Sequence, residues 1–126
     1  MKQLLSIIFI ALAVNLFGQT AIVTPATQCS NVTISNITTT SFKVNWTAGS
    51  GSRSVVVVRV VGNSNATPSN ANMGSYPTGG AYGQSAGSLG STNYVVDKVI
   101  GGTSTTVTGL TPGVNYEAVV YSYNYG

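Results

Sequence analysis

Apolar and polar residues alternate most clearly in the middle of the chain, where every second position of residues 42–47 is apolar. The apolar positions are Phe42, Val44 and Trp46, and the polar positions between and after them are Lys43, Asn45 and Thr47. A period of two is that of a β-strand with one buried and one solvated face. The pattern predicts a strand over residues 38–47.

Five further strands are expected, over residues 31–37, 53–61, 93–100, 105–110 and 114–124. Residues 53–61, with the sequence RSVVVVRVV, are apolar on both faces, which indicates a central strand or one covered on its second face. Parity places Val56, Val58 and Val60 on one side of it. In the last strand one face holds Tyr116, Ala118, Val120 and Ser122, and the other holds Glu117, Val119, Tyr121 and Tyr123.

Residues 62–92 form a long segment without periodicity that is rich in glycine. Loops of this length are uncommon in compact domains unless they fold onto them. We interpret the segment as an ordered insertion, pinned by Tyr76, Tyr82 and Leu89, with a flexible linker as the alternative.

Short strands joined by turns, with no helical pattern after the first residues, predict an all-β, immunoglobulin-like sandwich over residues 31–126. The residues expected in its core are Phe42, Val44, Trp46, Val56, Val58, Leu110, Tyr116, Ala118 and Val120.

The first residues predict export. Lys2 precedes an apolar run that ends at Leu16, and small and polar residues follow it, as in a secretory signal peptide. The run is shorter than the roughly 20 residues of a membrane span. We expect a signal peptide at residues 1–18, cleavage near Gly18–Gln19 and a leader at residues 19–30; a buried N-terminal helix or strand is the alternative. Cys29 lies too late for a lipid anchor and stands alone, so no internal disulfide forms.

The chain offers little for catalysis. It has five basic residues, two acidic residues, Asp97 and Glu117, and no histidine. The basic residues are scattered, whereas nucleic-acid binders cluster them, so no nucleic-acid partner is expected. Lys98 next to Asp97 suggests a pairing of the two at the surface, and Glu117 is expected on the outward face of its strand, so we interpret both carboxylates as solvated surface charges. These counts leave no histidine-based triad, zinc site or calcium cage, so neither an enzyme nor a bound metal or cofactor is expected.

The segment L-T-P-G-V-N-Y, from Leu110 to Tyr116, resembles the fibronectin type III family, and so does the spacing between this segment and Trp46. The glycine- and tyrosine-rich insertion resembles a variant found in secreted multidomain proteins of the Bacteroidetes. The resemblance implies a core indole at Trp46 and a tyrosine corner, in which the Tyr116 phenol is buried and hydrogen-bonds to nearby backbone. The family has a seventh strand that would pair with the last strand here. We expect either that the protein continues beyond Gly126 or that another chain supplies this strand.

The leading hypothesis is a non-catalytic module, a spacer or adhesion unit of a larger secreted or cell-surface protein. Its expected partners are neighbouring domains and a protein or polysaccharide. A first alternative is a carbohydrate-binding module that stacks sugar rings on Tyr121 and Tyr123, if these rings are outward and uncovered. The others are a strand-exchanging subunit and the accessory domain of a secreted enzyme.

Overall fold

The computed structural model describes residues 25–124, so the expected signal peptide lies outside the described residues. The described part holds seven strands and two 3-10 turns, and no α-helix. The strands are β1 (Ser30–Ser35), β2 (Phe42–Thr47), β3 (Arg53–Val60), β4 (Ser88–Gly90), β5 (Asn93–Val99), β6 (Ser104–Val107) and β7 (Tyr116–Tyr123). The turns, η1 (Asn70–Asn72) and η2 (Ser85–Gly87), lie in the insertion.

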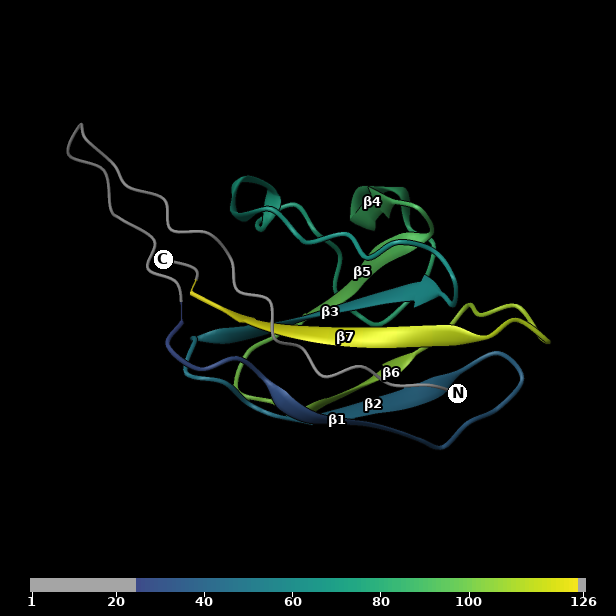
Figure 1. Ribbon diagram of the computed structural model, residues 1–126, viewed down its shortest axis with the longest axis horizontal. Helices are drawn as coiled ribbons and strands as arrows, with labels where there is room; N and C mark the ends of the chain where they lie inside the picture. The colour runs from purple at the N-terminus through teal and green to yellow at the C-terminus, as the bar shows by residue number, and fades with distance from the viewer. Residues whose placement is uncertain (1–24, 125–126) are drawn as a thin grey trace.

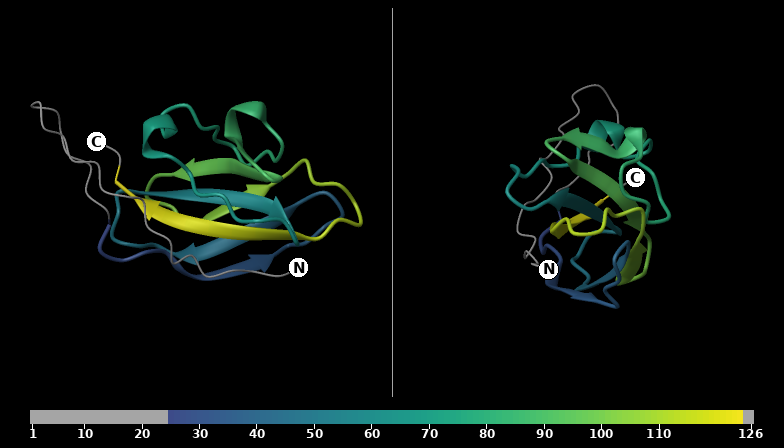
Figure 2. Two further views of the ribbon diagram at one scale, coloured as in Figure 1. Left: turned by 45° about the horizontal axis from the view of Figure 1, so that its top comes forward. Right: turned by 90° about the vertical axis from the view of Figure 1, so that its right-hand side faces the viewer.

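The strands form two antiparallel sheets that pack face to face (Figure 1). The three-stranded sheet has the order β1-β2-β6, and the four-stranded sheet has the order β4-β5-β3-β7. The insertion lies over the outer face of the four-stranded sheet as a third layer (Figure 2). The all-β sandwich predicted from the sequence is confirmed.

The main core lies between the sheets. Its buried members include every residue expected there: Phe42, Val44, Trp46, Val56, Val58, Leu110, Tyr116, Ala118 and Val120. All but Leu110, which lies between β6 and β7, come from alternate positions of the strands, because successive side chains of a strand point to opposite faces. The Trp46 indole nitrogen donates to the Ser54 hydroxyl at 3.2 Å, and the buried Cys29 thiol lies 3.5 Å from the same oxygen.

A second apolar cluster lies on the outer face of the four-stranded sheet. The sheet contributes Val55, Val57, Val95, Val119, Tyr121 and Tyr123, and the insertion contributes Met73 and Tyr76, with Leu89 packed against them. The cluster explains why β3 is apolar on both faces. It also shows that the insertion packs against the domain, as expected for Tyr76 and Leu89.

Three expectations about strands are corrected. Residues 38–41 are a turn, not the start of β2, because the Thr38 hydroxyl accepts hydrogen bonds from the backbone N–H of Thr40 and Ser41. The last strand begins at Tyr116 instead of residue 114. The insertion contains β4, so the described strands number seven instead of six.

The insertion also joins the two sheets along one edge. The Gly80 N–H donates to the Val96 carbonyl at 2.9 Å, and the Thr108 N–H donates to the Gly80 carbonyl at 3.0 Å. Ala81 makes a parallel β-bridge with Thr108. The four-stranded sheet is thereby tied through residues 80–82 to the chain that follows β6.

Candidate functional site

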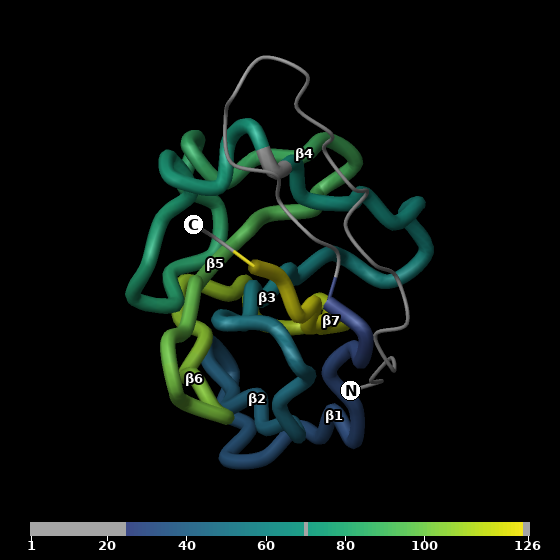
Figure 3. Tube along the Cα trace, turned by 90° about the vertical axis from the view of Figure 1, so that its left-hand side faces the viewer, coloured from purple at the N-terminus to yellow at the C-terminus, as the bar shows by residue number. Residues whose placement is uncertain are grey.

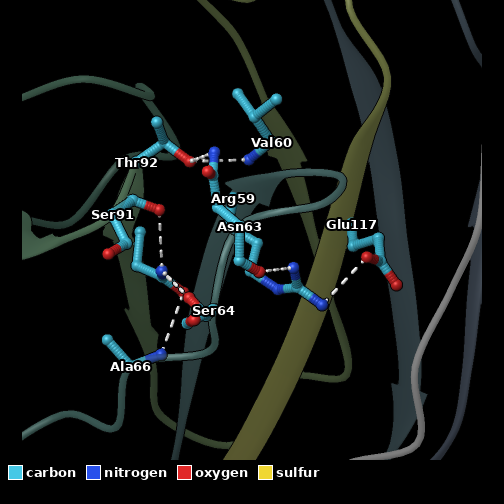
Figure 4. Close-up of polar contacts among 9 residues, drawn as sticks. Arg59, Val60, Asn63, Ser64, Ala66, Ser91, Thr92 and Glu117 are labelled. Atoms are coloured by element: carbon cyan, nitrogen blue, oxygen red, sulfur yellow. Dashed lines mark hydrogen bonds and ion pairs between the residues drawn. The ribbon is translucent and has the colours of Figure 1, made fainter.

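Polar contacts concentrate where the insertion leaves and rejoins the sheet (Figure 4). Arg59 of β3 lies directly opposite Glu117 of β7, and Nη2 of the arginine is 2.9 Å from Oε1 of the glutamate. Nη1 of Arg59 donates to the Asn63 carbonyl at the start of the insertion. The two side chains are only 10% and 6% exposed. The expectation that Glu117 is a solvated surface charge is therefore wrong.

The side chain of Asn93 joins the two ends of the insertion, residues 63–66 and 90–93, which are called its neck below. Its side-chain amide donates to the carbonyls of Ser64, Gly90 and Ser91, at 2.7, 3.2 and 3.0 Å. Its side-chain oxygen accepts from the Ala66 N–H at 3.2 Å. One side chain, 1% exposed, thus binds both ends of the insertion to each other. This explains how so long a loop leaves and re-enters the sheet at one place.

Thr92, the residue before Asn93, adds to the same closure. Its hydroxyl accepts from the Val60 N–H at 3.1 Å and from the Asn63 side-chain amide at 2.9 Å (Figure 4). The outgoing and incoming chains of the insertion are therefore held side by side by three uncharged side chains, of Asn63, Thr92 and Asn93.

The neighbours Asp97 and Lys98 do not pair with each other through their side chains, contrary to expectation. The Asp97 carboxylate accepts from the Thr105 hydroxyl at 2.5 Å and from the Gly79 N–H at 3.3 Å. The Lys98 ammonium donates to the carbonyls of Met73 and Gly74. The two side chains of this strand therefore fix different parts of the insertion.

Tyr121 and Tyr123 point to the outer face, as parity predicts, but the insertion covers them. Each is 1% exposed, with Met73 and Tyr76 in the same cluster. Burial raises the pKa of the Tyr121 phenol, against an opposing hydrogen bond with Thr67. A sugar ring cannot stack on rings that are already covered, so the alternative of a sugar-binding platform on these two tyrosines is wrong for this structure.

Tyr82 of the insertion packs against a different part of the domain. Its ring makes edge contacts with Tyr94 and Tyr116, with centroids 4.9 and 5.1 Å apart. Its hydroxyl donates to the Thr92 carbonyl at 2.6 Å, and burial raises its pKa. The Tyr116 hydroxyl in turn accepts from the Thr111 N–H at 3.0 Å, which is the tyrosine corner that the resemblance implied.

The outer edge of β7 is a further candidate site. Within residues 25–124, β3 is the only strand that pairs with β7. At one end of this edge the Ser122 N–H donates to the side-chain oxygen of Gln28 at 2.9 Å, and the Gln28 amide donates to the Ser122 carbonyl at 3.1 Å. The side-chain amide of Gln28 thus takes the place that the peptide of a neighbouring strand would occupy.

No three metal-binding side chains of His, Cys, Asp or Glu lie together in residues 25–124. The same part of the chain has no helix with the length and apolar character of a membrane span.

Sequence patterns identified the strands, and the family resemblance implied the tyrosine corner, but neither pointed to Arg59, Asn93 or Gln28. The sequence could have indicated the burial of Arg59, since this residue stands within a strand that is apolar on both faces. It contains no comparable indication for Asn93 or Gln28, because their hydrogen-bond partners lie far along the chain and only the folded register brings them together.

The model of the fibronectin type III domain matches residues 25–126. Comparison with curated proteins gave no significant match. The matched range includes both sheets, the insertion and the polar contacts at its neck.

Proposed function

Because the chain belongs to the fibronectin type III domain family, we propose that it is a non-catalytic module of a larger secreted or cell-surface protein. It acts there as a spacer or as an adhesion unit between neighbouring domains. Fold alone does not establish function, so the proposal also depends on what the polar residues do.

The observation that carries the proposal is the use of both carboxylates of the chain in holding the fold. Glu117 pairs with Arg59 under the insertion, and Asp97 binds the Thr105 hydroxyl and the Gly79 N–H. General acid–base catalysis needs a group within reach of a substrate. Both carboxylates here have structural partners, which supports a non-catalytic module.

Export is the second part of the proposal. The basic start and apolar run of residues 1–18 fit a signal peptide that is removed to leave a chain beginning near Gln19. The resemblance of the insertion to secreted Bacteroidetes modules supports the same location.

The proposal is tested by expressing the chain in a Gram-negative host, separating the cell compartments and sequencing the N-terminus of the product. We expect a product outside the cytoplasm that starts near Gln19. An Ile8→Asp variant, with a charge in the apolar run, serves as the matched control and should stay inside the cell. Cytoplasmic protein that retains residues 1–18 in the unaltered chain would overturn the proposal.

A further inference from the structure

The strand β3 lies in the middle of the four-stranded sheet, between β5 and β7 (Figure 3). Its residues 54–59 are all buried, because one face meets the main core and the other meets the cluster under the insertion. The valines at the consecutive positions 55–58 face the two clusters in turn. A strand that is apolar on both faces lacks the alternation of apolar and polar residues that normally fixes the register of a strand.

The pairing of β3 with β7 is nevertheless regular. It runs from Arg53 to Val60 without a shift, whereas the pairing with β5 is irregular between Val56 and Val57. A slip of β3 by two residues along β7 would keep every side chain on its own face, because the side chains of a strand alternate with a period of two. If Arg59 moved opposite Val119 in this way, the valines before it would still meet Val120 and Tyr121 of β7. The apolar side chains therefore give such a slip little resistance.

The charged side chains make these registers unequal. In the observed register Arg59 lies directly opposite Glu117, which is the only charged residue of β7. Nη2 and Oε1 are 2.9 Å apart, and the two side chains are 10% and 6% exposed. A slip of two residues would place Arg59 opposite Val119 or Asn115 and would move the carboxylate to a diagonal position, about 7–8 Å away along the ladder. The direct contact would then be lost, and a buried charge without its partner is costly.

A slip of one residue is opposed by the same arginine. It would turn the Arg59 side chain towards the main core, where residues 25–124 provide no carboxylate. The guanidinium would be buried among apolar side chains, which is more costly still.

Stability gives little reason for a buried ion pair at this place. Apolar residues of similar volume often replace such a pair without loss of stability, because burial of the two charges offsets most of their attraction. Nε of Arg59 is also buried without a partner among the described residues, which adds to the cost. The specification of one register is a role for which buried polar groups are known, and it fits a strand whose apolar pattern leaves the register open.

We propose that the ion pair of Arg59 and Glu117 selects the register of β3 against β7. Nη1 of Arg59 donates to the Asn63 carbonyl, so the same register also sets the point at which the insertion leaves the sheet. This role goes beyond the proposed function and holds whether or not the chain is exported.

The test compares the purified protein with its variants by NMR of the backbone amides. The unaltered protein should give one resonance for each amide of β3 and β7, and nuclear Overhauser contacts should show Arg59 opposite Glu117. Arg59→Met/Glu117→Leu removes both charges and should give a second set of resonances for these strands, with about a tenth of the intensity or more. A change of register breaks the pairing, so the two forms interconvert slowly and are seen separately.

Two further variants separate the charge pair from other effects. Arg59→Glu/Glu117→Arg exchanges the two charges and should give one set of resonances, with residues 59 and 117 still opposite each other. Lys43→Met removes a basic side chain from β2, in the other sheet, and should also give one set.

Each other result overturns the proposal. A single set in the observed register for Arg59→Met/Glu117→Leu would show that apolar packing selects the register. Failure of this variant to fold would assign the pair to stability instead. A second set in the unaltered protein, in the variant with exchanged charges or in Lys43→Met would show that the number of registers does not depend on the charge pair.

Discussion

Arg59 and Glu117 lie opposite each other on adjacent strands and form a buried ion pair, with 2.9 Å between Nη2 and Oε1. The pair joins β3 to β7 on the face that the insertion covers, and Arg59 also holds the first residues of the insertion through the Asn63 carbonyl. Nε of the arginine is buried without a partner among the described residues. The arginine therefore depends on Glu117 for compensation of its charge.

The first prediction concerns this pair. Glu117→Ala should lower the free energy of unfolding by about 3–5 kcal/mol, because it leaves the buried Arg59 charge uncompensated. The double variant Arg59→Met/Glu117→Leu removes both charges and should cost far less. Urea denaturation of the two proteins measures the difference. Equal losses in both would show that packing, and not charge compensation, accounts for the effect.

The second prediction concerns the tyrosine corner. Tyr116→Phe keeps the ring in the core but removes the oxygen that accepts from the Thr111 N–H. We expect a loss of about 1 kcal/mol in the free energy of unfolding. Tyr94→Phe is the control, since no described residue hydrogen-bonds to its hydroxyl. A loss in the control as large as that in Tyr116→Phe would contradict the assignment.

The third prediction concerns the neck of the insertion. Asn93→Ala removes an amide that bonds to residues at both ends of the insertion and should cost about 2–3 kcal/mol. Residues 62–92 should also become the first site cut in limited proteolysis. Asn63→Ala removes one side-chain bond to Thr92 and should change the cleavage much less. First cleavage elsewhere in Asn93→Ala would show that Asn93 does not close the insertion.

The fourth prediction uses two adjacent glycines with positive φ, Gly79 at 98° and Gly80 at 90°. A Cβ at Gly79 meets no atom within 4 Å, whereas one at Gly80 would lie 2.0 Å from the Thr106 carbonyl oxygen. Gly79→Ala should therefore cost only backbone strain, about 1–2 kcal/mol. Gly80→Ala should cost about 1–3 kcal/mol more, because the bridge between the sheets must move. Thermal unfolding of the two variants measures the difference in stability. Equal losses would show that a Cβ at residue 80 does not clash with the Thr106 carbonyl oxygen.

The fifth prediction follows from the raised pKa of Tyr121, which is caused mainly by burial. A phenol whose pKa is higher in the folded than in the unfolded chain binds its proton more tightly in the folded state. Its contribution to stability is complete below the unfolded pKa of about 10 and is lost as pH rises through the folded value. Urea midpoints should fall above about pH 10, and they should fall less in Tyr121→Phe. An identical fall of the urea midpoint in Tyr121→Phe would show that Tyr121 does not cause the loss of stability at high pH.

The positions of the strands followed largely from the sequence because alternation is a local property. Phe42, Val44 and Trp46 show their common face without reference to any partner, and the parity of β3 separated Val56 and Val58 from Val55 and Val57 as observed. Where a local competitor was present, the pattern failed. The hydroxyl of Thr38 offers the backbone hydrogen bonds of its own, and it turns residues that alternation would place in a strand.

The candidate sites were less accessible to sequence reasoning because they depend on contacts between distant residues. Tyr121 and Tyr123 were placed on the correct face, but whether that face is open depends on Met73 and Tyr76, which reach it from the insertion. Gln28 lies in a segment without periodicity, and its partner Ser122 stands 94 residues later.

The sequence by itself determined the all-β class and the inner and outer faces of the main strands, because each is encoded by spacing within a few residues. The tyrosine corner came from the resemblance of residues 110–116 to the fibronectin type III family. The tertiary structure alone decided that both carboxylates are structural, that the insertion forms a third layer, and that β7 has one neighbour within the described residues. These properties depend on strand order and register, which bring residues together that no short-range pattern connects.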